Sequence, residues 1–521
     1  MSATTKNTLS KPPVNSQITT FGGIVHCQWE ADSPVTLHGH LPYFCEFMHV
    51  GGLFERLVKS CPLKYRSNNA PKVGDVVGTM LLSILSGHTR YRHVGTLYGD
   101  TVSPVMLGIK QLVSYDSLRR AFAKVDEQAA IKWLQDELLY CCEPLLSAGY
   151  VLDLDPTVKP LYGHQEGAKK GYNPKKPGRP SHCYHSYFIG SLRLVLEAEV
   201  RPGNETAGRY SHAGLWDILD NRLQRHLYPS LIRGDIAFGN EDTMVGCESR
   251  KVKYLFKLKQ SGNVKKLIEQ LEKSNHDIWQ NVGDGWDGYE TQLQLMGWSC
   301  SRRVIVLRRP APSKKQQESD VKRLPTAKTV VQEELLFPDI IEPEEVPEYD
   351  WAVLVTNLDE SMVAVSQLYR DRGDCENIFD ELKNQWGWGG FTTHDLKRSS
   401  VMARMIALIY NWWNIFCRLA EPDKHMEAKT SRPLLQQVIG RLSNRGGKRL
   451  LHLTAVGAQA ADARRLFEQV SSFLNQIIST APQLNPVYNW TLILARAFKA
   501  FLRGRPLLPG AEGKQMLLPI T

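Results

Sequence analysis

The sequence has little that would indicate a zinc protein, a nucleotide-cofactor enzyme or a membrane protein. No CxxC pair occurs among its ten cysteines, so neither a zinc ribbon nor a disulfide framework is indicated. No GxxxxGKS/T or GxGxxG motif occurs, which leaves nucleotide-cofactor chemistry without support. The most apolar stretch, residues 401–420, is interrupted by two arginines and two asparagines, so we expect no membrane span.

The beginning of the chain also lacks a secretory signal. Residues 1–20 are polar, contain two adjacent prolines and have no apolar central segment. Together with the scattered cysteines, this favours a protein of the reducing cytoplasm.

Size and charge favour a multidomain globular protein with an anionic partner. The chain has 521 residues, more than one compact domain usually holds. Apolar residues make up 42% and charged residues 23%, as in folded globular proteins. A net charge of +10 indicates affinity for polyanions without naming one.

Composition and periodicity divide the chain into six segments. We expect, in order, a flexible tail, a helical region, a mixed α/β region, a strand-rich region ending in an acidic linker, a second region with a strand and helices, and a basic helical region. The boundaries are 1–20, 21–148, 149–240, 241–350, 351–420 and 421–521, with the acidic linker in residues 331–350. Within these segments we expect helices over residues 213–227 and 401–420 and strands over residues 302–308 and 351–356.

Two predicted strands carry acids at positions suited to metal binding. Residues 150–155 predict a strand ending at Pro156, and strand alternation places Asp153 and Asp155 on the same face. Asp235 ends a second predicted strand, residues 231–235. Each acid could hold a metal ion, but each alone is also typical of an ordinary turn.

A third group of polar residues lies in a predicted helix spanning residues 362–386. Tyr369, Arg372, Glu376 and Lys383 have the spacing 0, 3, 7 and 14, which places them on one helix face. A salt-bridged surface is the common alternative. Three carboxylates from two strands and a helix would form an oxygen-rich site suited to Mg²⁺, with the arginine and lysine near phosphates.

Basic residues gather in a loop after the first acidic strand. Residues 161–180 contain a single acid, Glu166, and the glycines and Tyr172 would permit close approach to a nucleic-acid backbone and stacking on a base. The alternative is a basic loop without function. The predicted DNA-contacting residues of this loop are Lys169, Lys170, Lys175, Lys176 and Arg179.

Two other basic segments leave the choice open. The predicted helix 114–124 could contact DNA or could be an ordinary surface helix. In the C-terminal region, which we expect to be helical, a solvated face and contact with a nucleic-acid backbone are equally supported. The basic residues in question there are Arg432, Arg441, Arg445, Lys448 and Arg449.

Three ordered motifs resemble one family. Tyr369-x2-Arg372-x3-Glu376-x6-Lys383 resembles the YREK signature of bacterial insertion-sequence transposases of the DDE type. Residues 152–182, 232–240 and 369–387 resemble the three catalytic blocks of the transposase DDE group 1 family, the insertion-sequence 1380 group.

The resemblance implies a fold and a catalytic triad. The expected fold is α/β: an RNase H-like core, a mixed sheet flanked by helices, interrupted by a strand-rich insertion domain between the second Asp and the Glu. The implied triad is Asp155, Asp235 and Glu376, holding Mg²⁺ or, as a substitute, Mn²⁺. Asp155 is preferred to Asp153 because the family's acid is commonly followed by x-Thr, here Pro156-Thr157.

The resemblance also implies roles toward DNA. Residues 21–148 would bind DNA or dimerise, and residues 149–240 and 351–420 would form the two parts of the core around the insertion, residues 241–350. Tyr369, Arg372 and Lys383 would contact phosphates of the element end. Trp351, at the start of a predicted strand, matches a Trp that stacks on a flipped base in related hairpin-forming transposases; a core Trp is the alternative.

The implied function is cut-and-paste DNA transposition. The chain would bind double-stranded DNA, both the inverted repeats of its element and the target, as a homodimer near the bacterial nucleoid and without a membrane. Two alternatives share the motifs: an RNase H-like nuclease that never joins ends, and a transposase-derived DNA-binding protein without catalysis.

Overall fold

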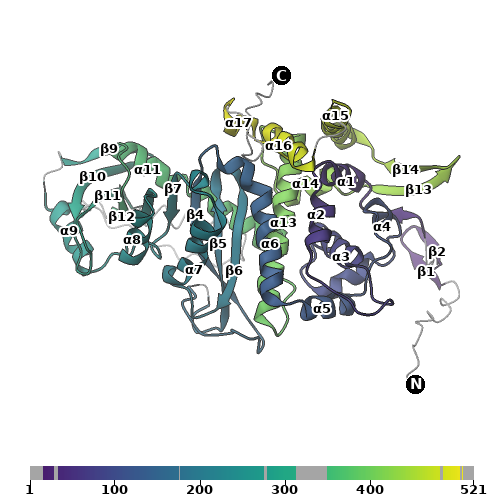
Figure 1. The fold of residues 1–521 in the computed structure, drawn as a ribbon, viewed down its shortest axis with the longest axis horizontal. Coiled ribbons are helices and arrows are strands. Elements are labelled where there is room, and N and C mark those ends of the chain that lie inside the picture. The colour runs from purple at the N-terminus through teal and green to yellow at the C-terminus, as the bar shows by residue number, and fades with distance from the viewer. Residues whose placement is uncertain are drawn as a thin grey trace, which may run out of the picture. The chain divides into compact units, whose positions relative to one another are not determined.

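The computed structural model describes residues 16–28, 33–174, 176–274, 278–311, 349–480, 485–504 and 507. The chain forms two compact units (Figure 1). Unit 1 combines Met1–Leu145 with Asp380–Thr521, and unit 2 is Leu146–Phe379. Lys175 and nearly all of the acidic linker predicted in residues 331–350 lie outside the described residues.

Unit 2 is built on one nine-stranded mixed sheet, whose strand order is β6-β5-β4-β7-β8-β12-β11-β10-β9. Strands β4, β5 and β6 form an antiparallel meander, and β7 and β8 run parallel to β4. The strands are β4 Val151–Pro160, β5 Ser181–Ile189, β6 Leu194–Pro202, β7 Leu231–Gly234, β8 Tyr254–Lys257, β9 Gln280–Gly283, β10 Trp286–Leu293, β11 Arg302–Pro310 and β12 Tyr349–Thr356.

Strand β4 does not end at Pro156 as the sequence predicted. It continues to Pro160, because β5 pairs with it along its whole length. On its other side β7 pairs with β4 only up to Leu154. Beyond Leu154 that side of β4 is an edge, where a proline without an N–H is tolerated.

The strands of the expected insertion continue the same sheet. Strand β12 pairs with β8 on one side and with β11 on the other, and β10 and β9 follow outward. One face of these strands packs on Met362 and Val365 of helix α11. The strand-rich segment therefore widens the central sheet and does not build a sheet of its own.

The helices of unit 2 are short. A single helix was predicted for residues 213–227, but the chain there changes from α-helix to a π turn and then to a 3-10 turn. The helical elements are α7 His212–Asp217, η4 Ile218–Arg222, η5 Arg225–Leu227, α8 Glu241–Ser249, α9 Gly262–Glu272 and α11 Met362–Arg370, with the 3-10 turns η2 Gly190–Leu192 and η3 Gly208–Ser211. Helix α12 Gly373–Gln385 crosses the boundary between the units.

Unit 1 is mainly helical and is centred on α13 Leu396–Ala420, nearly all of whose residues are buried. Among the described residues, no helix is both long and apolar enough to span a membrane. The other helices of unit 1 are α1 Leu41–Val50, α2 Leu53–Ser60, α3 Val73–Leu85, η1 Tyr91–Leu97, α4 Val102–Met106, α5 Tyr115–Lys124, α6 Glu127–Leu146, α14 Ala428–Leu435, α15 Gly457–Thr480, α16 Pro486–Ala497 and α17 Lys499–Leu502.

Unit 1 also contains strands that the sequence reasoning missed. Residues 439–454, expected to be helical, form the hairpin of β13 Ile439–Arg445 and β14 Lys448–Thr454, which pairs with β3 Val35–Thr36. A second hairpin, β1 Ser16–Thr20 with β2 Gly23–Cys27, begins within the predicted tail. In the β13–β14 hairpin both turn residues, Gly446 and Gly447, have the positive φ that short β-turns need, whereas in the β1–β2 hairpin the residue with positive φ is Gly23, the first of β2.

Candidate active site

Two acids lie side by side where parallel strands β4 and β7 meet. The register pairs Asp153 with Arg233 and Leu154 with Gly234. The residues that follow these pairs are Asp155 on β4 and Asp235 directly after β7. The alternation of side chains along paired strands places both on the same face of the sheet. Asp235 Oδ1 accepts a hydrogen bond from the Ala237 amide at 3.0 Å, which fixes the start of the following loop.

The neighbouring acid, Asp153, is occupied by a buried arginine. Arg233 Nε donates to Asp153 Oδ1 at 2.5 Å and Nη2 donates to Oδ2 at 2.9 Å. Both side chains are buried, at 0% exposure for the acid and 4% for the arginine. A bidentate pair of this kind holds the carboxylate in place, so Asp153 has a buried structural partner, whereas the Asp155 side chain is 17% exposed.

The same arginine explains why the single helix predicted for residues 362–386 is two helices, α11 and α12. Arg233 Nη1 donates to the carbonyl of Leu368, the group that would accept from the Arg372 amide in a continuous α-helix. The Arg372 amide donates instead to the Tyr369 carbonyl at 3.1 Å, and the chain breaks between α11 and α12. The prediction of one continuous helix over residues 362–386 was therefore wrong.

Arg372, at this break, links two of the predicted catalytic acids. Its Nη2 lies 3.1 Å from Asp155 Oδ2, and its Nη1 lies 3.7 Å from Glu376 Oε1. The arginine side chain is 11% exposed, whereas Glu376 is 72% exposed. Burial lowers the pKa of Arg372, but the nearby Asp155 and Asp235 carboxylates more than offset it, so the net shift is upward and the guanidinium stays charged.

Tyr369, which lies in unit 2 together with Arg372 and Glu376, also faces the acids. Burial raises its pKa to about 12; Arg372 lowers it, while Asp235 and Asp155 raise it further. The phenol is therefore protonated at neutral pH and can donate a hydrogen bond. Lys383 lies on the part of α12 that belongs to unit 1, and its side chain is exposed.

Trp351 is half-buried in an aromatic cluster at the start of β12. Its ring lies 5.7 Å from that of Trp279 and 5.9 Å from that of Tyr349. The Arg308 guanidinium lies over Trp279 at 4.1 Å and over Tyr349 at 4.8 Å. The half-burial of Trp351 fits both predictions made from the sequence, because a half-buried indole can be part of a core or can offer a ring face for stacking.

The predicted basic loop connects β4 and β5. Lys169, Lys170, Lys176 and Arg179 are all exposed. Lys176 and Arg179 both lie over the ring of Tyr162, at 5.1 and 4.7 Å, so part of the loop's positive charge is held against one aromatic ring.

Sequence reasoning missed Lys159 as a member of this face. Lys159 lies four residues after Asp155 on β4, and the alternation that joined Asp153 with Asp155 also includes it. Its side chain is half-buried, and burial lowers its pKa to about 8. The missed signal was the strand length, which was thought to end at Pro156.

The carboxylates have the chemistry of a magnesium site without forming a cage. Within the described residues, no three His, Cys, Asp or Glu side chains gather into a group that could hold a metal ion. Mg²⁺ is usually held by one or two carboxylates together with waters and substrate phosphates. The adjacent Asp155 and Asp235 fit that requirement, although Arg372 now occupies Asp155 Oδ2.

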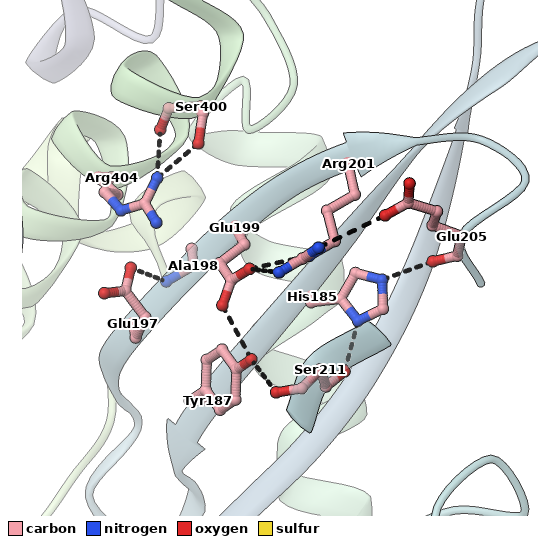
Figure 2. Close-up of polar contacts among 10 residues, drawn as sticks. All are labelled: His185, Tyr187, Glu197, Ala198, Glu199, Arg201, Glu205, Ser211, Ser400 and Arg404. Carbon is pink, nitrogen blue, oxygen red and sulfur yellow. Dashed lines mark hydrogen bonds and ion pairs between the residues drawn. The ribbon is translucent and has the colours of Figure 1, made fainter. Parts of the chain in front are cut away.

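The opposite face of the same strands carries a second polar network (Figure 2). His185 and Tyr187 are paired with Pro156 and Leu154, so they point away from the Asp155 face. The His185 ring hydrogen-bonds the Ser211 hydroxyl and the Glu205 carbonyl, the latter at 2.7 Å.

Charged groups complete this network. The Tyr187 hydroxyl lies 3.0 Å from Glu199 Oε1 and 2.8 Å from the Ser211 carbonyl, and Arg201 Nη2 lies 2.7 Å from Glu199 Oε2. Because each of these groups is satisfied within the network, its role is to hold β5, β6 and η3 together.

Comparison with known proteins gives a family match and a distant structural similarity. No curated protein matches the chain. A structure of piggyBac transposase, in a synaptic complex with hairpin DNA, matches with 10% identity and a TM-score of 0.33, over 92% of this chain and 87% of that chain. A similarity at this level carries no argument about the site.

The family comparison covers most of the chain. The family described as Transposase DDE domain group 1 matches residues 43–476. The matched range includes strand β4 with Asp155, Asp235 directly after strand β7, and the helix that carries Glu376. Enzymes with a DDE transposase domain transfer phosphoryl groups in DNA, which agrees with the acidic face described above. The chain belongs to the DDE group 1 family of transposases.

Proposed function

We propose that this chain cuts the ends of its own insertion sequence and joins them to target DNA, with Asp155, Asp235 and Glu376 as the catalytic acids. One observation carries the proposal. Asp155 and Asp235 lie at adjacent positions of parallel strands, and Arg372 links Asp155 to Glu376 at the break between α11 and α12. This arrangement supports a site in which two acids lie at one edge of the sheet and the third, the exposed Glu376, is connected to them through Arg372.

The strand arrangement supports an RNase H-like core, and the spacing of Tyr369, Arg372, Glu376 and Lys383 supports the YREK subgroup, the insertion-sequence 1380 group. The antiparallel meander β4–β6 followed by the parallel β7 and β8 forms the mixed sheet expected of such a core. The acids come from its central strand β4, from the end of β7, and from a helix that reaches the same face. Strands β9–β12 enter between the second and third acid, where an insertion is expected.

The residues supply the charges that phosphodiester chemistry needs. When bound by these carboxylates, Mg²⁺ or Mn²⁺ would lower the pKa of the attacking hydroxyl and neutralise charge on the phosphate. Arg372, released from Asp155, would bind a non-bridging phosphate oxygen, and the neutral phenol of Tyr369 would donate a hydrogen bond to another.

The reaction has two balanced displacements. In the first, a water oxygen bonds to phosphorus as the bond from phosphorus to the 3′ oxygen breaks, which releases a 3′-hydroxyl. In the second, that 3′-hydroxyl attacks another phosphodiester and displaces its 3′ oxygen. Each step transfers one proton away from the attacking oxygen and one toward the leaving oxygen, and positioning is the protein's main contribution.

Further residues are proposed to hold the DNA. Lys383 and the exposed loop residues Lys169, Lys170, Lys176 and Arg179 would contact phosphates, and Trp351 would stack on an unpaired base. We propose a homodimer near the nucleoid, because two element ends must be cut and joined in one complex.

A strand-transfer assay tests this function. The full chain is incubated with a pre-cut duplex of the DNA that flanks its gene, a supercoiled target plasmid and Mg²⁺, beside reactions with EDTA and with Glu376→Gln. Metal-dependent joining that the variant loses is the expected result. Cutting of uncut ends without joining would indicate a nuclease instead, and binding without either reaction would indicate a DNA-binding protein derived from a transposase.

A further inference from the structure

The hairpin of β13 and β14 is a ribbon anchored at one end only. Figure 1 draws it extending beyond the helices of unit 1. At the base, Gly440 and Arg441 pair with β3, and the Leu442 amide donates to the Pro34 carbonyl at 2.9 Å. From Ser443 to the turn and back to Leu450, the ribbon has no further neighbouring strand among the described residues.

The ribbon's turn matches its sequence. Gly446 and Gly447 have φ of +53° and +73°, as a two-residue turn of type I′ requires at both central positions. The turn fixes the register, so that Arg445 lies opposite Lys448 and Asn444 lies opposite Arg449.

The charge on the ribbon is unbalanced. No acidic residue occurs between Glu427 and Asp462. The side chains of Arg441, Arg445, Lys448 and Arg449 are exposed, and none forms an ion pair within the part of the chain that the structure describes. Arg445 and Lys448 face each other directly, a like-charged pair that destabilises a hairpin. A local cost without a local gain is typical of a surface that meets a partner of opposite charge.

One face of the ribbon combines cations with hydrogen-bonding groups. Alternation places Arg441 and His452, Ser443 and Leu450, and Arg445 and Lys448 together on it. The free part spans roughly 10–13 Å at about 3.3 Å per residue. The major groove of B-DNA is about 12 Å wide and about 8.5 Å deep, and it admits a two-stranded β-ribbon.

We infer that this ribbon enters a groove of duplex DNA, with Arg445, Lys448 and Arg449 on the phosphates that border the groove. The inference rests on the proposed function in one respect, namely that DNA is the substrate. It adds a DNA-binding element at the free end of the ribbon, residues 443–450 of unit 1, whereas the proposed catalytic acids belong to unit 2.

The test uses the full chain and measures binding to duplex DNA in EDTA across a salt titration. Each phosphate contact contributes about one to the slope of log affinity against log salt and roughly fivefold in affinity near 0.15 M salt. The triple variant Arg445→Gln/Lys448→Gln/Arg449→Gln is therefore expected to bind roughly 10²-fold more weakly, with a slope shallower by about three.

Two further variants separate charge from structure. The matched control replaces three exposed lysines of the same unit, Lys59, Lys64 and Lys110, by Gln, with the same change in net charge. It is expected to bind nearly as the wild type does. A truncated ribbon joins Leu442 and Leu451, which face each other in register, through Gly-Gly and should bind as weakly as the triple variant.

Wild-type affinity and slope in the triple variant would overturn the inference, as would equal losses in the control. Binding of an RNA duplex as tight as that of DNA would also overturn it, because the major groove of RNA is too narrow to admit a ribbon. The proposed function fails separately: a wild-type chain that never cuts or joins, yet binds DNA through the ribbon, would contradict only the catalytic proposal.

Discussion

The two faces of strands β4 and β5 each carry a cluster of charged residues, but the clusters differ in how they are satisfied. On one face, His185, Tyr187, Glu199 and Arg201 bind one another and nearby backbone carbonyls. On the other face, Arg372 reaches Asp155 at 3.1 Å and Glu376 only at 3.7 Å, and Glu376 is 72% exposed. The first cluster is closed; the second is open to a ligand.

The open face is itself supported by a closed pair. Asp153 and Arg233 lie on the same side as Asp155, yet they are fully buried and bind each other in a bidentate pair. Arg233 also fixes the helix break that carries Arg372. The burial of an acid and its ion-pair partner, not the type of residue, therefore distinguish a structural acid from a candidate catalytic one.

The largest effect is expected at the open face. Asp235→Asn or Glu376→Gln should lower the rate of metal-dependent DNA cleavage by roughly 10³-fold or more, because each removes a carboxylate proposed to hold the metal. The thermal melting midpoint should stay within about 2 °C of wild type, because the buried Arg372 that contacts Glu376 keeps its closer contact with Asp155, and an amide at position 235 can still accept the hydrogen bond from Ala237. Cleavage rates and melting curves on the same preparations measure both.

Asp153→Asn should have the opposite profile. It leaves the Arg233 charge buried without its carboxylate, so the free energy of unfolding should fall by about 3–5 kcal/mol. Asp155→Asn is the matched control two residues away and should cost less free energy of unfolding than Asp153→Asn, because Arg372 keeps Glu376 as a partner, while cleavage is lost. Denaturant unfolding of the two variants gives the comparison; equal stability losses would contradict the assignment of roles.

The closed network should make stability depend on pH. Burial lowers the pKa of His185 to about 4, from 6.5 in the unfolded chain. Below pH 6.5 the unfolded state binds a proton that the folded state refuses, so stability is full above pH 6.5 and falls by about 3 kcal/mol as the pH drops to 4.

The control for this pH dependence is His185→Gln, which removes the titrating ring. Urea unfolding measured at pH 7.5 and pH 4.5 should show a smaller pH difference for the variant than for the wild type. An unchanged pH difference would show that other groups cause it.

The smallest effect is expected for Arg372→Lys. Lysine keeps a positive charge near Asp155 but lacks the planar fork that reaches both acids. Cleavage should fall about tenfold, or about 1.4 kcal/mol in activation free energy, and Arg372→Gln should fall further. A lysine variant as weak as the glutamine variant would show that geometry alone determines the role of Arg372.

Sequence alternation could place Asp153 and Asp155 on one face, but it could not separate their environments. The distinction comes from Arg233, eighty residues later, whose contact with Asp153 depends on the register of β4 with β7. Periodicity likewise predicted one helix for residues 362–386. It could not show the break, because the break depends on a hydrogen bond from the same distant arginine to the Leu368 carbonyl. Contacts between distant segments are not visible in local patterns.

The ribbon shows a different kind of error. Its leucines and arginines have no helical periodicity, and Gly446-Gly447 between two alternating runs is a hairpin signal that was present in the sequence. The strands 302–308 and 351–356 and the buried helix 401–420 were predicted correctly, because long apolar runs of one period determine them.

One measurement tests the central claim, that the open face is the catalytic site, most directly. Cleavage of DNA carrying the gene's own flanking ends is measured with Mg²⁺ and with EDTA, for the wild type, Asp155→Asn and Asp153→Asn, each at a temperature where it is folded. The account predicts metal-dependent cutting by the wild type and by folded Asp153→Asn, and none by Asp155→Asn. Cutting by Asp155→Asn at the wild-type rate would contradict it.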